Sequence, residues 1–219
     1  MRQFLKSALA ILAAFATGLG TASPAEEVRL DLCKVAVPQI AADSTIFIKT
    51  FSTDNVDLGT GKKKHKEKAR ETAESMKEIA PSAFTEAFIS HLKKEGQFLE
   101  VLKYGEGETG AGESGEGQLG EGALLVEGEF TLLNPGSRGK RHWVGFGAGK
   151  SKICVKGHVV NAQQEELATF EDCRSGNLGL FGGRAEGMMV IDIYKGAYYL
   201  ADFMVTWAKG DLPTSVTEK

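Results

Sequence analysis

Residues 145–151 (GFGAGKS) are the part of this sequence that comes nearest to a known chemical motif, the phosphate-binding P-loop. That motif requires a glycine, four further residues, and then Gly-Lys-Ser or Gly-Lys-Thr. Here only three residues separate Gly145 from Gly149, and the position that should hold the first glycine holds Val144. A P-loop also leads into a helix whose N-terminus binds the phosphate, whereas Ser151 leads into a strand pattern. The sequence therefore predicts that this segment binds no nucleotide, and its glycines are expected to let the chain pass close beneath a helix.

Patterns of catalysis and metal binding are missing from the sequence. The four histidines are scattered, at His65, His91, His142 and His158, and their spacing assigns no nucleophile, base and orienting group to one site. No HExxH segment and no paired-cysteine metal pattern occurs. We therefore expect no catalytic residues, no metal and no cofactor. A hydrolase, or another enzyme with its site among the glycine-rich loops, is the alternative.

A cationic cluster is the better candidate for a contact surface. Arg138, Lys140, Arg141 and Trp143 lie in the connector 137–150, just before its glycines. Arginine and exposed tryptophan are frequent anchors of protein interfaces, and the same cations would suit an anionic glycan or lipid headgroup. A half-buried Trp143 beside merely solvated cations explains the same residues equally well. The sequence leaves these two interpretations open.

A second basic run, residues 62–70 (KKKHKEKAR), also has two interpretations. It could bind anionic lipid, lipopolysaccharide or nucleic acid. However, Ala69, Ala73, Met76 and Ala80 follow at helical spacing among polar residues, which is typical of a helix with a solvated face. No aromatic residue interleaves the lysines as a stacking platform would require. The solvated face is therefore favoured, and a chain of formal net charge −3 is not expected to bind nucleic acid.

The first 25 residues have the three parts of a secretory signal peptide. Arg2 and Lys6 precede an apolar run over residues 8–19, and small residues follow. This run is shorter than the roughly 20 apolar residues that span a bilayer. We expect cleavage after Ala25, with Ala22 as the alternative site. The mature protein is then expected in the periplasm or secreted, with no transmembrane span.

The remaining residues, 26–219, suffice for one domain with a real core. Strand patterns cover residues 27–37, 44–51, 98–104, 123–133, 152–160 and 166–173. Helical spacing of apolar residues predicts helices after the basic run, after Pro81, and over residues 188–209. This order predicts a single α+β domain with a mixed or mainly antiparallel sheet backed by helices. Residues 105–122, mainly glycine and glutamate, are expected to form a flexible surface loop.

The three cysteines allow one disulfide and leave one thiol over. If a four-residue turn follows Asn161, then Asn161 faces Glu166, and counting outward along this hairpin brings Cys154 opposite Cys173. A lysine and a glutamate of opposite charge fall opposite each other in between and support the register. Directly opposed residues are within disulfide reach. The sequence therefore predicts a Cys154–Cys173 bridge, which suits an exported chain, and an unpaired Cys33.

The region from about Ser44 to the terminal helix resembles the bacterial family 4410 of domains of unknown function. Its most specific part is residues 126–149, with VEGEF followed by GSRGKR and VGFGAG. The order of elements is also similar to envelope proteins of the curli-secretion and penicillin-binding-protein-activator type, in which a helix-backed mixed sheet serves in protein contacts. That second likeness concerns topology alone, and a fold does not fix a function. The loop 105–122 and the cysteine pair are not attributed to the family pattern.

These observations favour an exported envelope protein that acts as a non-enzymatic binding or assembly module. Its expected partner is an envelope protein, or an anionic glycan or lipid, contacted through Arg138, Lys140, Arg141 and Trp143. The family resemblance implies no established activity.

Overall fold

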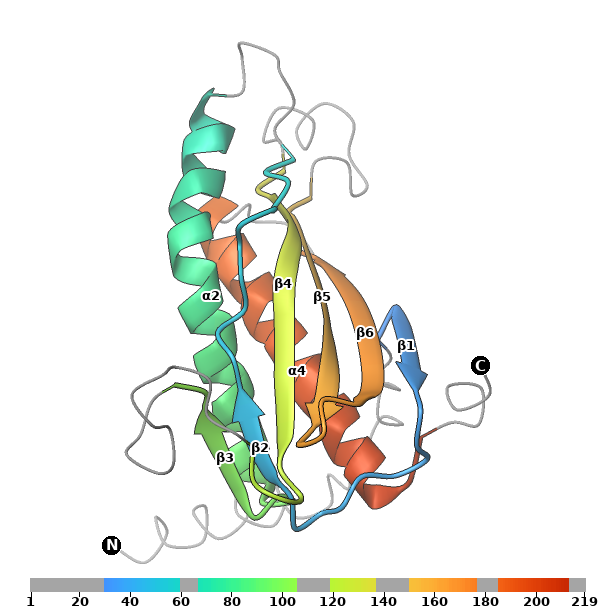
Figure 1. Ribbon diagram of the computed structural model, residues 1–219. Helices are drawn as coiled ribbons and strands as arrows, with labels where there is room; N and C mark the ends of the chain where they lie inside the picture. The colour runs from blue at the N-terminus through green and yellow to red at the C-terminus, as the bar shows by residue number, and fades with distance from the viewer. Residues whose placement is uncertain (1–29, 60–66, 106–118, 137–149, 177–184, 213–219) are drawn as a thin grey trace, which may run out of the picture.

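The structure is a computed structural model that describes residues 30–59, 67–105, 119–136, 150–176 and 185–212. Within these ranges, two helices cover one face of a six-stranded sheet (Figure 1). The strands are β1 (Leu32–Val35), β2 (Thr45–Ile48), β3 (Glu100–Lys103), β4 (Leu124–Asn134), β5 (Lys152–Asn161) and β6 (Glu166–Ser175), and the helices are α2 (Glu67–Glu95) and α4 (Ala185–Lys209). The chain therefore forms the single α+β domain that the sequence predicts.

The sheet is mixed, and its strands are ordered β1-β6-β5-β4-β2-β3. Strand β2 runs parallel to both of its neighbours, β3 and β4, whereas the pairs β4–β5, β5–β6 and β1–β6 are antiparallel. Helix α2 connects the parallel strands β2 and β3, since such strands need a long crossover between them. Because β1 and β2 lie far apart in the sheet, the segment between them crosses its lower end in Figure 1.

Helix α2 is continuous through Pro81, where the sequence predicts a new helix to begin. Proline has no N–H, so it cannot bond to the carbonyl of Lys77 four residues earlier. The hydroxyl of Thr53 donates to that carbonyl instead, at 3.3 Å. Residues before and after Pro81 also share one buried stripe, formed by Ala73, Met76, Ala80, Phe84, Phe88 and Leu92. The predicted boundary is wrong because burial of this stripe and an outside donor offset the missing hydrogen bond.

Helix α4 packs beside α2 on the same face of the sheet and is tied to the N-terminal arm. Its buried residues include Met189, Ile193, Ala197, Leu200, Met204 and Trp207. The indole N–H of Trp207 donates to the carbonyl of Val37 at 2.9 Å, and the amide of Gln39 donates to the carbonyl of Ala208 at 2.8 Å. No helix in the described ranges is long and apolar enough to cross a bilayer.

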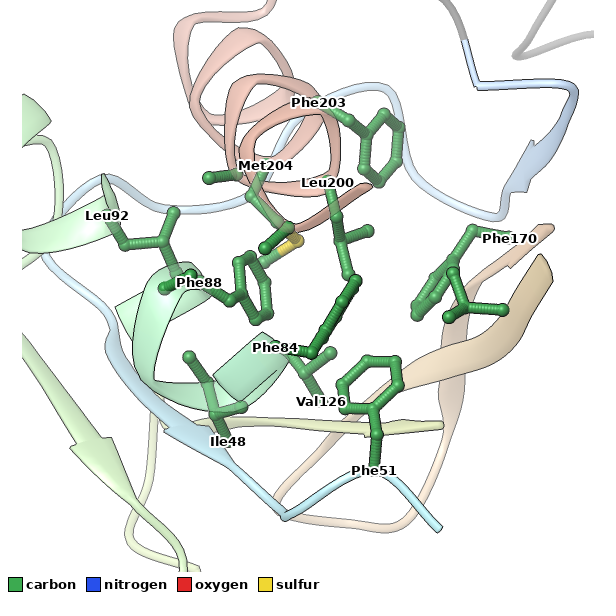
Figure 2. Packing of buried hydrophobic residues seen from close by; sticks show 14 of the residues in the cluster. Ile48, Phe51, Phe84, Phe88, Leu92, Val126, Phe170, Leu200, Phe203 and Met204 are labelled. Carbon is green, nitrogen blue, oxygen red and sulfur yellow. The ribbon is translucent and has the colours of Figure 1, made fainter. Parts of the chain in front are cut away.

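Aromatic rings fill the space between the helices and the middle of the sheet (Figure 2). Phe51 packs against Phe84 of α2 with ring centroids 4.6 Å apart, and Phe170 lies 6.3 Å from Phe51. Beneath these rings, Gly128 and Gly157 face each other across β4 and β5. A Cβ atom on Gly128 would collide with the Phe51 ring, and one on Gly157 would lie 2.5 Å from Cζ of Phe170. The glycine pair therefore sets how closely the aromatic layer approaches the sheet.

The glycine pair generates a stability prediction. We expect Gly157→Ala to destabilise the protein by about 1–3 kcal/mol, because the new Cβ meets both backbone and the Phe170 ring. Gly187 in the first turns of α4 has no atom within 4 Å of such a Cβ. Gly187→Ala should therefore be neutral or stabilise by up to about 1 kcal/mol. Urea unfolding measures both, and equal effects of the two changes would contradict the proposed contact.

The hydrogen bond that spans Pro81 can be tested by a double-mutant cycle. We expect Thr53→Val to cost about 1 kcal/mol, because valine keeps the shape of threonine but leaves the Lys77 carbonyl without its donor. In a Pro81→Ala background, the N–H at position 81 can reach that carbonyl, so Thr53→Val should cost measurably less. Unfolding free energies of the four proteins give the interaction energy, and a value of zero would show that Thr53 does not replace the proline's missing donor.

Candidate binding surface on the helix-free face of the sheet

The sheet face that points away from the two helices carries an ordered set of polar side chains. Side chains alternate between the two faces of a strand, so the residues between the core positions of β4, β5 and β6 point away from the helices. Together with three residues that follow β2, they line an open hollow of about 500 Å³, a volume typical of ligand sites. We call this set the outer face: Lys49, Thr50, Ser52, Glu127, Glu129, Lys156, His158, Thr169 and Glu171.

Glutamates of β4 hold the two lysines of the outer face. Nζ of Lys49 lies 3.0 Å from Oε1 of Glu127, and Nζ of Lys156 lies 3.0 Å from Oε1 of Glu129. Nε2 of His158 lies 3.8 Å from the other oxygen of Glu127. These groups are partly exposed, so the pairs contribute little to stability. The pairing of the strands nevertheless places positive and negative groups in an alternating order across three adjacent segments.

Glu171 gives the outer face an excess of negative charge. The sequence predicts Lys156 opposite Glu171, and the β5–β6 register confirms this, although the ammonium group pairs with Glu129 of β4 instead. The lining thus carries three carboxylates against two ammonium groups. The fully charged groups of this lining therefore have a small excess of negative charge.

The predicted disulfide lies next to the outer face. It joins Cys154 of β5 to the directly opposite Cys173 of β6, with 4.1 Å between the two Cα atoms. The register differs from the prediction only at the turn, where Val160 instead of Asn161 faces Glu166. The side chain of Asn161 accepts two hydrogen bonds from N–H groups of the turn, and a bulge beside Val160 takes up the extra residue.

Cys33 is the free thiol, as the sequence predicts. It pairs with Phe170, whose ring lies in the core, so the Cys33 side chain lies on the helix side of the sheet. Burial raises the pKa of Cys33 to about 12. Such a thiol forms very little thiolate near neutral pH and is therefore a poor nucleophile, and it lies on the opposite face of the sheet from the disulfide.

A buried hydroxyl–carboxylate contact lies where β5 begins. Oγ of Ser151 donates to Oδ2 of Asp192 on α4 at 2.7 Å, and neither residue has exposed surface. In the sequence, Ser151 is only the end of the failed P-loop, and Asp192 is only one acidic residue within the predicted helix 188–209. Because both residues are fully buried, the contact offers no nucleophile to a substrate in solution. It therefore gives no support to an enzyme site beside the glycine-rich segments.

Several sequence predictions fall outside the described residues. Arg138, Lys140, Arg141 and Trp143 are among them, so the cationic cluster stays a prediction. The same holds for residues 62–66 of the basic run and for residues 106–118 of the predicted loop. At the end of that loop, Leu119 is buried against Leu125 and Val160.

The described part of the basic run agrees with a solvated helix face. Arg70 is exposed on α2 and lies 3.8 Å from Glu74, one turn further along. Across the described ranges, no three His, Cys, Asp or Glu side chains lie together as metal ligands would.

A known family matches the part of the chain that contains strands β2 to β6 and the crossover helix α2. The family described as "Domain of unknown function (DUF4410)" matches residues 46–179, more than half of the chain. The chain belongs to this family. The match runs from β2 through β6 and stops before α4, slightly short of the predicted extent. The looser likeness to curli-secretion and penicillin-binding-protein-activator type proteins stays a prediction.

No curated protein matches this chain. Two similar solved structures are PelC dodecamers from Paraburkholderia phytofirmans. One, a point variant, is 10% identical, with a TM-score of 0.41, and the alignment covers 78% of this chain and 98% of that chain. The other is 9% identical, also with a TM-score of 0.41, and the alignment covers 77% of this chain and 94% of that chain.

Proposed function

We propose that this chain is an exported, non-enzymatic binding or assembly module of the cell envelope, and that it contacts an envelope protein through the outer face. The observation that carries the proposal is the hollow of about 500 Å³ on a sheet face that points away from both helices, where strand pairing sets charges of both signs in a fixed order. Preorganised charges of both signs favour one orientation of a partner and disfavour wrong partners.

Export is supported by the N-terminal pattern and by the disulfide. Residues 1–25 have the charge, apolar run and small residues of a signal peptide. Disulfides such as Cys154–Cys173 persist mainly in oxidising compartments. The proposed location is the periplasm or the outside of the cell.

A protein suits the outer face better than an anionic glycan or lipid. Three carboxylates against two ammonium groups would repel a polyanion, whereas a protein surface can match both signs. The cationic cluster Arg138, Lys140 and Arg141, with Trp143, is proposed as a second contact, and an anionic glycan or lipid is its proposed partner.

A charge-swap experiment tests the outer face. The double variant Glu129→Lys with Lys156→Glu keeps the ion pair and the net charge but reverses their order on the surface. We expect it to fold with unchanged stability and to lose most of the envelope proteins that the wild-type protein retains from a solubilised envelope extract. Mass spectrometry of the eluted proteins, at matched loading and salt, gives the measurement.

The same exchange at an ion pair on α2 is the matched control. Arg70→Glu with Glu74→Arg reverses an exposed pair on the other side of the molecule and should leave capture unchanged. If the outer-face swap retains the same proteins as wild type, the outer face is not the contact. Loss only after Arg138→Ala, Lys140→Ala and Arg141→Ala, with glycan or lipid in the wild-type eluate, would assign binding to the cationic cluster instead.

The export proposal predicts a defined mature N-terminus. Cleavage after Ala25 leaves Glu26 as the first residue, and cleavage after Ala22 leaves Ser23. We expect intact-mass analysis of protein from a periplasmic or culture fraction to give one of these two starts. An intact Met1 in the functional pool would refute the signal peptide and with it the proposed location.

A further inference from the structure

Three elements meet at Asp192. Strand β5 begins and β6 ends at the upper edge of the sheet in Figure 1, with the start of α4 behind them. Ser151, which precedes β5, donates its hydroxyl to Oδ2 of Asp192 at 2.7 Å. Gly176, which follows β6, donates its N–H to the carbonyl of Ser151 at 3.2 Å. A Cβ on Gly176 would lie 2.6 Å from Oγ of Ser151 and 3.3 Å from Oδ2 of Asp192, so the three residues are in tight contact.

Among the residues that the structure describes, none gives a hydrogen bond to the second carboxylate oxygen of Asp192. Oδ1 is buried and accepts no hydrogen bond, while Oδ2 takes the bond from Ser151. A buried ionised carboxylate with one uncompensated oxygen is costly, whereas the neutral acid is much less so. The site is therefore more stable with a proton on the carboxyl, unless it opens and lets water reach Oδ1.

Within the described ranges, the charged groups around Asp192 do not neutralise it by direct contact. Lys195, on the same helix, is the cation whose charge acts on the carboxyl and favours its ionised form. On β6, Arg174 is bound to Asp172 and lies 3.8 Å over the Tyr199 ring. Lys152 at the start of β5 is exposed. On the first turns of α2, the charged residues Glu67, Arg70, Glu71, Glu74 and Glu78 are likewise exposed.

We infer that Asp192, Ser151 and Gly176 form a proton-controlled latch between α4 and the upper ends of β5 and β6. The latch is tight when the carboxyl is protonated and loosens when the carboxyl is ionised. It acts at the two strand ends from which residues 137–149 and 177–184 continue, so one proton sets how firmly both ends are held.

The direction of the pH effect follows from linkage. Burial raises the pKa of Asp192 in the closed latch, against the opposing effects of Ser151, Lys195 and the N–H of Gly176. In an open, hydrated latch the pKa returns toward the ordinary aspartate value of about 3.9. The closed state thus binds the proton more tightly and loses stability as pH rises from that ordinary value through the raised pKa. Since one proton is involved, the opening constant rises by at most about tenfold per pH unit within this window and is constant outside it.

Hydrogen exchange of the folded protein tests the latch. We expect the amide of Gly176 and the amides at the upper ends of β5 and β6 to exchange faster as pH rises from about 4 to 8, after correction for intrinsic rates. In Asp192→Asn, which keeps the shape but cannot titrate, the corrected rates should not depend on pH. A carboxyl on the same helix gives the matched control: burial also raises the pKa of Asp202, so Asp202→Asn should leave the pH dependence at Gly176 intact.

Two outcomes would overturn the inference. One is a corrected exchange rate at Gly176 that does not change with pH in the wild-type protein. The other is the same pH dependence in the wild type and in Asp192→Asn. If that variant does not fold, the carboxyl carbon signal of Asp192 and the amide signal of Gly176 are followed by NMR in the wild type. Titration of both signals with one midpoint above the ordinary aspartate value supports the latch, and separate midpoints refute it.

Discussion

The contact between two aromatic rings and two facing glycines is the constraint on which the rest of this structure depends. The rings of Phe51 and Phe170 lie directly against the backbone of Gly128 and Gly157. Because these rings lie so close to the sheet, Phe84 can pack on Phe51 and hold α2 near the sheet (Figure 2). The glycines also fix what faces outward, because their neighbours on each strand point the opposite way. A slip of one residue would place glutamates and lysines in the core. The same strand register therefore determines both the packing of the core and the order of the charges on the outer face.

Much of the architecture was predictable because local patterns and final contacts agree. Alternating apolar residues predict each strand of the sheet, and counting along one hairpin predicts the bridge between Cys154 and Cys173. The helix boundary at Pro81 was wrong because its compensation comes from Thr53, a residue of another segment. The register next to the turn also differed from the prediction. There the Asn161 side chain accepts two hydrogen bonds from the turn, which a count of residues along the strands does not reveal.

The candidate site was much less predictable than the fold. Its ion pairs join Lys49 to Glu127 and Lys156 to Glu129, residues brought together only by the pairing of β4 with its neighbours. Counting along the β5–β6 hairpin places Glu171 opposite Lys156. The same count does not reveal Glu129, because β4 is not part of that hairpin. Asp192 looked like an ordinary polar break in an apolar segment. Its burial depends on three elements that meet only in the folded chain.

The Ser151 hydroxyl is fully buried, and the Cys33 thiol is half-buried on the helix side of the sheet. The lysines of the outer face, by contrast, are exposed and lie beside glutamates of β4. On the outer face, a partner would therefore meet mainly charged side chains.

The hydrogen bonds between the N-terminal arm and the end of α4 bear on the order in which contacts form during folding. Val37 meets Trp207 across 170 positions of sequence, and Gln39 meets Ala208 across 169. We expect contacts so distant in sequence to form late, because the loops that they close include most of the chain. Until the last helix has emerged, β1 lacks this anchorage beside β6, and β6 is left as an open sheet edge. A chain that ended before Trp207 would lose both hydrogen bonds that anchor its first strand, so a truncation at the C-terminus would expose the sheet edge next to the N-terminal arm to strand-mediated aggregation.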